Sequence, residues 1–340
     1  MRKSDGVASL LSMSKGADTV MLDAVPLDGP TSAGVSPKRM AWNRFRRDRW
    51  AMVGLAIAAV YLLVAVLAPL ICKVLGISPT RIDRDALNDF GLPNGKFGGI
   101  SGKHWLGVEP STGRDILARL MYGARVSLFV GFVCAVLSTA IGMALGMFAG
   151  YFRGKFDTVT SRFCDLILTF PSLILVVALT RPATQRLEAL GLPEGNPARL
   201  TYIILVTAVF AWVGVFRLVR GQTLAIRERE FIEAARSSGA PSRHIVFREL
   251  LPNLWAPVIA ITSTALPGFV SLEAALSFLG VGILPPSASW GVMLDDSVHY
   301  YRADPMYFFI PGFSLFVLVM AFYLLGEGLR SALDPKSQPA

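Results

Sequence analysis

The sequence contains few charged residues, few cysteines and few histidines. Charged residues make up 17% of the 340 residues and hydrophobic residues 53%. This charge fraction is low for a soluble domain and favours a membrane protein. The cysteines show no Cys-x-x-Cys or Cys/His spacing, so we expect neither a disulfide framework nor a metal site. We interpret Cys72, Cys134 and Cys164 as small buried apolar residues.

Motifs for nucleotide binding or hydrolysis are also absent. The Gly-Lys pairs lack both the upstream glycine and the following Ser or Thr of a phosphate-binding loop. His104, His244 and His299 are far apart in the sequence, and no metal cluster or hydrolytic triad is predicted. We therefore expect no cofactor and no enzymatic chemistry in this chain. Any ATP that a process involving this chain uses must therefore be bound by another chain.

Long apolar runs are what the sequence has instead. A helix needs about 20 predominantly apolar residues to cross the hydrocarbon core of a bilayer. The runs predict an all-α integral membrane protein with six transmembrane helices. These are expected at 51–72, 126–152, 163–180, 200–216, 257–281 and 306–326.

Basic residues set the expected orientation. A cluster from Lys38 to Arg49 lies directly before the first span, and most Lys and Arg residues fall on the same side of the predicted membrane. The net charge of +9 is thus interpreted as a cationic cytoplasmic face and not as a nucleic-acid-binding surface. We expect a multi-pass protein of the cytoplasmic (inner) membrane with both termini in the cytoplasm. The basic residues of 73–125 run against this rule, which long translocated segments follow poorly.

The sequence divides into four predicted segments. Residues 1–37 lack sustained periodicity and are expected to form a disordered cytoplasmic tail. Residues 38–125 contain a basic lead-in at the lipid headgroups, the first span and a long external segment. Residues 126–330 form a core of five spans with a cytoplasmic loop at 221–256, and 331–340 form a second cytoplasmic tail.

Small residues recur at every fourth position of the second predicted span. On a helix, Ser138, Gly142, Gly146 and Gly150 lie on one face. Such a face lets two helix backbones approach closely, so we interpret it as a helix-packing surface. A flexible gate is the alternative interpretation.

Two acidic residues fall inside predicted spans, where a charge is costly. Asp165 lies near the cytoplasmic end of its span, and we expect either snorkelling to the headgroups or a salt bridge to Arg162. Glu273 lies deeper, and we expect a hydrogen-bonded structural carboxylate; proton coupling is the alternative. Three prolines within spans predict kinks or local unwinding. They are Pro171, Pro267 and Pro311.

A polar, basic segment separates the fourth and fifth predicted spans. Its residues predict a helix at 231–238, which Gly239 ends with a positive φ. Ser242 can cap a second helix at 243–251 that stops near Pro252. We expect two short helices joined by a tight turn and lying parallel to the membrane surface.

The expected first helix has a composition suited to a partner protein. Ala234 and Ala235 give it a flat face, and Glu233 and neighbouring arginines give it charged edges. Such a helix fits a cleft in another protein. An ordinary amphipathic loop on the lipid headgroups is the alternative.

This segment resembles the signature loop of ABC-importer permease subunits. The resemblance rests on Glu233-Ala234-Ala235, Gly239 and the later Leu251-Pro252. Further motifs between residues 40 and 335 resemble the dipeptide/oligopeptide permeases in the same order. They are Trp105-Leu106-Gly107, Gly113-Arg114-Asp115, Phe170-Pro171-Ser172-Leu173, Glu273 to Gly280, Pro285-Pro286, Trp290-Gly291, Gly328-Leu329-Arg330 and Leu333-Asp334-Pro335.

The resemblance implies a type I ABC-importer permease fold and half of a translocation pathway for di- and oligopeptides. It also implies that the Glu233–Pro252 loop docks into a separate ATPase. The implied partners are a second, homologous permease in a heterodimer, two cytoplasmic ATP-binding subunits and an extracytoplasmic solute-binding protein. Departures are Glu249, where the family usually has Ile, Glu327, where Asp is frequent, and the long tail 1–37.

Other functions remain open at this stage. An ion-coupled secondary carrier would use Glu273 and Asp165, and a membrane-anchored scaffold would have no transport role. Within the resembling family, permeases for nickel or other small solutes are further alternatives. The composition of the chain does not separate these substrates.

Overall fold

The structure is a computed structural model that describes residues 37–95 and 97–333. Nearly all of the predicted tail 1–37 and most of the tail 331–340 lie outside the described residues. Residues 41–340 form one unit, and the arrangement below is that of its described part. The helix α1 (Pro37–Arg47) covers the basic lead-in.

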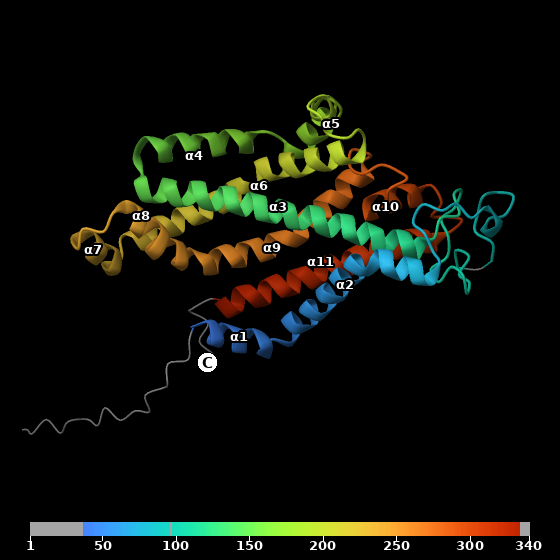
Figure 1. The fold of residues 1–340 in the computed structure, drawn as a ribbon, viewed down its shortest axis with the longest axis horizontal. Helices are drawn as coiled ribbons and strands as arrows, with labels where there is room; N and C mark the ends of the chain where they lie inside the picture. The colour runs from blue at the N-terminus through green and yellow to red at the C-terminus, as the bar shows by residue number, and fades with distance from the viewer. Residues whose placement is uncertain (1–36, 96, 334–340) are drawn as a thin grey trace, which may run out of the picture. The chain divides into compact units, whose positions relative to one another are not determined.

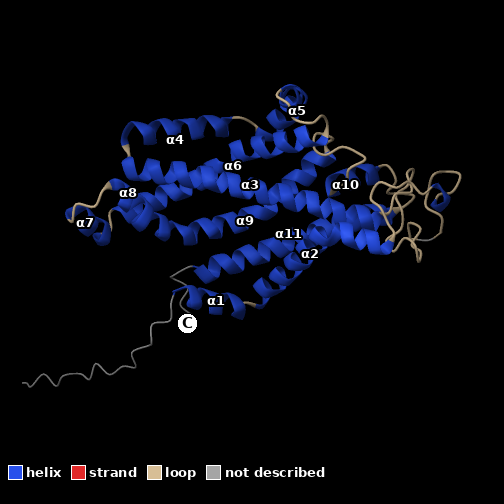
Figure 2. Cartoon of the chain, viewed as in Figure 1, coloured by secondary structure: helices blue, strands red, loops and turns tan. Residues whose placement is uncertain are grey.

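Most of the described residues are helical. The longest loop lies between α2 and α3 (Figure 2). This agrees with the all-α architecture predicted from the apolar runs. The helices of the unit are α2 (Arg49–Leu75), α3 (Ile116–Phe152), α4 (Gly154–Thr169), α5 (Ser172–Ala189), α6 (Asn196–Arg227), α7 (Glu230–Ser237), α8 (Ser242–His244), the π-helical turn η2 (Ile245–Leu250), α9 (Leu251–Phe278), α10 (Trp290–Val298) and α11 (Pro305–Leu333).

Among the described residues, five helical stretches are long and apolar enough to cross a membrane. They are α2, α3, α6, the continuous stretch 242–278 and α11. A sixth span is present if α4 and α5 count as one, although they are bent by 84° at their junction. In Figure 1, α3 runs between α6 and α9, and α11 lies beside α2.

The span predicted at 163–180 is broken at Phe170-Pro171, which confirms the kink or local unwinding predicted at Pro171. Phe170 is extended (φ −81°, ψ 132°), the conformation that a following proline favours. α5 is seen nearly end-on in Figure 1, whereas α4 lies along α3. Pro267 and Pro311, in contrast, lie within α9 and α11, which stay helical through them.

The small residues predicted to form a packing face lie where α3 meets α6. A Cβ atom added to Gly142 would come within 2.6 Å of Val215 Cβ, and one added to Gly146 within 2.8 Å of the Phe216 carbonyl oxygen. The two backbones therefore approach more closely than any larger side chain allows. Ser138 is buried, and its hydroxyl donates to the Ala135 carbonyl at 3.2 Å.

The segment 76–115 between α2 and α3 is held on the helices by buried charges. Glu109 is 1% exposed and accepts hydrogen bonds from Arg114 Nε at 2.7 Å and the Tyr307 hydroxyl at 2.9 Å. Arg119 of α3, fully buried, pairs with the same carboxylate. Because each of these buried charges has a partner, the segment gains a specific attachment to α3 and α11.

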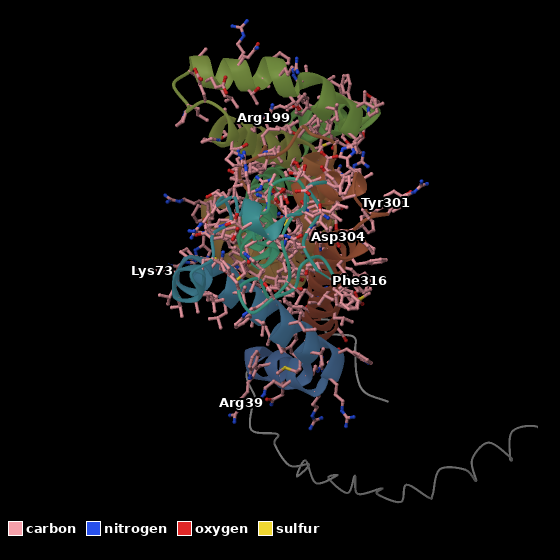
Figure 3. All side chains as sticks on the ribbon, turned by 90° about the vertical axis from the view of Figure 1, so that its right-hand side faces the viewer. Arg39, Lys73, Arg199, Tyr301, Asp304 and Phe316 are labelled. Carbon is pink, nitrogen blue, oxygen red and sulfur yellow. The ribbon has the colours of Figure 1, made fainter. Side chains whose placement is uncertain are left out.

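A second polar group joins this segment to the start of α3. Asp115 caps α3 by accepting from the Ala118 amide at 2.7 Å, and it also contacts His104 Nδ1 at 2.8 Å. Lys103 donates to Asp83 and lowers the pKa of that carboxyl. Figure 3 looks onto this end of the helices, with Asp304 labelled beside the same segment.

We predict that Gly146→Val destabilises the protein, because the new side chain would collide with α6. Overpacking of this kind costs about 1–3 kcal/mol of unfolding free energy. The matched control is Gly221→Val on α6, since a Cβ atom at Gly221 meets nothing within 4 Å. The measurement is the thermal unfolding midpoint of each purified variant. Equal midpoints for the two variants would contradict the packing interpretation.

Candidate functional site

The polar segment begins with the short helix α7 and a tight turn. Gly239 has φ +78°, which confirms the predicted positive φ at the end of this helix. Its amide donates to the Arg236 carbonyl at 2.9 Å, and the Ala240 amide donates to the Ala235 carbonyl at 3.0 Å. The last carbonyls of α7 are thereby satisfied, and the chain reverses within a few residues.

The predicted stop of the second helix near Pro252 is wrong. Helical structure continues from Ser242 to Phe278 and includes the span α9. The π-helical turn η2 ends two residues before Pro252, which has no amide hydrogen to donate to the preceding turn. The Asn253 side chain donates to the Glu249 carbonyl at 2.7 Å and so satisfies an oxygen near the proline.

The start of this helix also differs from the prediction. Pro241 occupies the N-cap position, and the Ser242 side chain forms no capping hydrogen bond. The predicted first helix is present as α7, whereas one continuous helix connects the turn after α7 with the membrane span in place of the predicted second surface helix.

The two sides of α7 face different surroundings. Ile232 is fully buried, and Ala235, one helical turn later, packs against the same apolar cluster. Glu233 and Ala234 are exposed. The expectation that both alanines share one outer face is therefore wrong, because Ala235 points inward with Ile232. In the following helix, Leu251 is half-buried and Pro252 is exposed.

A group of arginines surrounds the last turn of α3 beneath α7. The guanidinium carbon of Arg236 lies 5.7 Å from the centre of the Tyr151 ring. Arg227 donates to the Tyr151 carbonyl, and Arg153 pairs with Glu228 at 2.6 Å. Tyr151 could not be singled out from the sequence, since an aromatic residue at the end of a span has no distinguishing spacing.

Asp165 pairs with a different arginine from the one predicted. Its carboxylate lies 2.8 Å from Arg217 Nη2 on α6, and both side chains are about half exposed. The predicted partner was Arg162 on the same helix. The partner on α6 was not foreseen because it depends on how α4 and α6 lie side by side.

Glu273 is buried at the far end of α9, with 1% of its surface exposed. It accepts hydrogen bonds from Ser277 at 2.8 Å and from Ser127 of α3. Its partners among the described residues are hydroxyl groups from two helices. This geometry suits a structural carboxylate that connects α9 to α3. Glu273 and Asp165 have separate partners and form no common site.

A groove of about 730 Å³ lies between α6, α9 and α11 and reaches the first residues of α7. One part of its wall is apolar, and polar groups occupy the remainder, including two arginines. The residues that line it are Leu218, Gln222, Ile226, Arg229, Phe231, Asn253, Ala256, Pro257, Ala260, Ile261, Thr264, Arg330 and Leu333.

Comparison with known protein families identifies the family of this chain. Residues 142–338, more than half of the chain, match the family described as "Binding-protein-dependent transport system inner membrane component". The chain belongs to this family. Residues 36–87 also match the N-terminal transmembrane domain of oligopeptide transport permease C. The chain is thus a multi-pass permease subunit, and the family consists of transport components.

The sequences of named relatives align with nearly the whole length of the permease. It is 36% identical over 302 residues to the dipeptide transport system permease protein DppC of Alkalihalophilus pseudofirmus, covering 89% of this chain and 91% of the relative. It is also 36% identical over 320 residues to the glutathione transport system permease protein GsiD of Escherichia coli O1:K1, covering 93% and 96%. These relationships favour an ABC-importer permease over an ion-coupled secondary carrier.

A solved structure shares the fold. The inward-facing MetNI methionine ABC transporter aligns with a TM-score of 0.51 and 21% sequence identity, covering 64% of this permease and 96% of that chain. At this identity the likeness concerns the fold, which is that of type I ABC-importer permeases.

We predict that Glu273→Gln retains uptake, because the amide preserves an acceptor for the hydroxyl groups around it. Glu273→Leu leaves these hydroxyl groups without their partner and is expected to cost about 1–3 kcal/mol of unfolding free energy. Uptake and thermal unfolding of both variants are the measurements. Loss of uptake in a well-assembled Glu273→Gln variant would support proton coupling and contradict the structural role.

Proposed function

We propose that this permease carries di- and oligopeptides, or closely related peptide-like solutes, into the cell. The observation that carries the proposal is 36% identity to a dipeptide permease and to a glutathione permease across about nine tenths of the chain or more. Dipeptides and glutathione are both small peptides with free carboxylates. The match to the oligopeptide permease C family at residues 36–87 is consistent with the same substrate class.

The second part of the proposal concerns α7, which we assign as the contact for a cytoplasmic ATPase. Glu233 and Ala234 are exposed and available to a partner, whereas Ile232 and Ala235 attach the helix to the permease. Gly239, Leu251 and Pro252 belong to the same coupling loop through the turn and the start of α9. The continuous helix 242–278 supplies a direct connection from this contact to the membrane span.

This assignment implies an orientation. Both termini and α7 lie in the cytoplasm, and the segment 76–115 lies outside. Within the described residues, we keep the proposed basic lead-in, first span and external segment of 38–125 and the permease core of 126–330, except that residues 116–125 already belong to α3. The basic residues around α7 support this orientation, because cytoplasmic segments of membrane proteins are enriched in Lys and Arg.

The groove between α6, α9 and α11 is proposed as the cytoplasmic section of the half-pathway. It reaches Arg229 and Phe231 at the α7 end. Both apolar and polar side chains line its wall. A second, homologous permease would supply the opposite wall. An extracytoplasmic solute-binding protein would deliver the solute, and two ATP-binding subunits would engage the coupling loops of the two permeases.

Transport then follows from two conformations of the assembled importer. ATP binding draws the ATPases together, and the docked loops move with them. The spans shift from inward-open to outward-open, and hydrolysis resets the cycle. The permease contributes the pathway and the mechanical connection to this cycle.

We predict that Gly239→Val impairs uptake while the importer still assembles. Valine at φ +78° costs about 1–2 kcal/mol and would distort the turn that orients α7. The control is Gly191→Val, since Gly191 also has a positive φ and a Cβ atom there meets nothing within 4 Å. Uptake by both variants, at equal amounts of complex, is the measurement. Full uptake by Gly239→Val would contradict the role of the turn.

Glu233→Lys tests the ATPase contact itself. Reversal of this exposed charge is expected to reduce the amount of ATPase that co-purifies with the permease. Unchanged co-purification would contradict the docking role of α7.

The substrate class has its own experiment. The solute-binding protein encoded beside this permease is expected to bind dipeptides in calorimetric titrations, and dipeptides are expected to stimulate ATP hydrolysis by the complete importer. Binding of nickel without binding of peptides would overturn the peptide assignment and leave the ABC-importer assignment intact.

A further inference from the structure

The attachment of α7 to the permease combines apolar packing with one ring contact. Ile232 is the α7 residue that is fully buried. It belongs to a cluster that includes Met147 and Tyr151 of α3, Val219 of α6 and Val246 of η2, and Ala235 packs against the same cluster. The apolar packing holds α7 against three elements, and the contacts of an aliphatic side chain have little directionality.

Arg236 supplies the directional contact that Ile232 lacks. It lies one turn after Ile232 on α7, and its guanidinium carbon is 5.7 Å from the centre of the Tyr151 ring. This distance is within the range of a cation–π interaction. Tyr151 is 8% exposed, so its ring is held by its surroundings and gives Arg236 a fixed surface.

Tyr151 is also bound through its backbone. It lies in the last turn of α3, where carbonyl oxygens have no partner within the helix. Arg227, at the end of α6, donates to the Tyr151 carbonyl. A cation at this position is also favoured by the helix dipole. One residue of α3 therefore holds the end of α6 through its carbonyl and α7 through its ring.

The rest of α3 is connected as well. The glycines at 142, 146 and 150, in the half of α3 that ends near Tyr151, contact α6, and Ser127, toward the other end, donates to Glu273 of α9. A displacement of α7 that reaches Tyr151 thus acts on the helix that contacts both α6 and α9. This route is separate from the continuous helix 242–278, which connects α7 to α9 through the chain itself.

We propose that Tyr151 is a positioning residue for energy coupling. Its ring holds α7 against the end of α3 through Arg236, and it transmits the movement of α7 to α3. The inference rests on the proposed docking of α7 on an ATPase. In this inference Tyr151 transmits the movement of α7 to α3, and the exposed face of α7 binds the ATPase.

The experiment uses the complete importer, with both permeases, the ATPases and the binding protein, in proteoliposomes. Dialanine is the transported probe, and uptake per ATP hydrolysed is measured. Tyr151→Leu is expected to lower this ratio about three- to fivefold, the size of one lost cation–π contact. Tyr151→Phe retains the ring and the carbonyl and is expected to stay near wild type. Tyr323→Leu, the same change at an exposed tyrosine on α11, is the matched control.

A double-mutant cycle separates positioning from a general loss of structure. Arg236→Met alone is expected to lower the ratio as much as Tyr151→Leu, and the two changes together are expected to lower it no further. Full additivity of the two losses would overturn the inference, as would an unchanged ratio in Tyr151→Leu. If Tyr151→Leu does not assemble, Arg236→Met at its exposed position decides, and wild-type coupling in that variant overturns the inference.

Co-purification distinguishes this inference from the proposed function. Tyr151→Leu and Arg236→Met are expected to retain wild-type amounts of ATPase. If either variant loses the ATPase, the residue belongs to the docking surface and the transmission role is wrong. If Glu233→Lys retains the ATPase, the proposed docking of α7 fails independently of the result at Tyr151.

Discussion

The close contact between the backbones of α3 and α6 is the constraint on which the other helices depend. Lipid tails are as apolar as leucine side chains, so helices in a bilayer associate through close packing and hydrogen bonds more than through apolar burial. Gly142, Gly146 and Gly150 remove the side chains that would keep the two helices apart. Because α3 also contacts α2, α4 and α9, its packing against α6 determines where these helices lie relative to one another.

The α7 region combines firm attachment with an exposed polar face. Ile232 and Ala235 bury the inner side of α7, and Glu233 and Ala234 remain exposed on the other. A short helix has too few residues to be stable alone, so its inner contacts hold it in place. The proposed coupling uses both properties. The exposed face of α7 can bind a partner, and the packed inner side can pass the movement of α7 on to the spans. Packed helices transmit such movement because their contacts deform little.

Much of the fold and part of the site could be predicted because the signals are local. Apolar runs predicted the helices, and Gly239 predicted a turn with positive φ. Prolines show the limit of such signals. Pro171 breaks its span as predicted, but Pro267 and Pro311 leave their helices unbroken, and Pro252 lies in the first turn of a helix that was expected to stop near it. Proline is tolerated in the first turn of a helix because the missing amide hydrogen is not needed there, so the same residue type can stop or start a helix.

The sequence by itself determined the class of protein, the approximate positions of the spans and the polar segment that carries the family signature. These follow from hydropathy and from residues that act within one or two helical turns. Only the tertiary structure decided which side chains meet, such as Asp165 with Arg217 and Tyr151 with Arg236. Contacts of this kind depend on the rotation and offset of one helix against another. Those are set by packing over the whole interface, and no local pattern in one sequence encodes them.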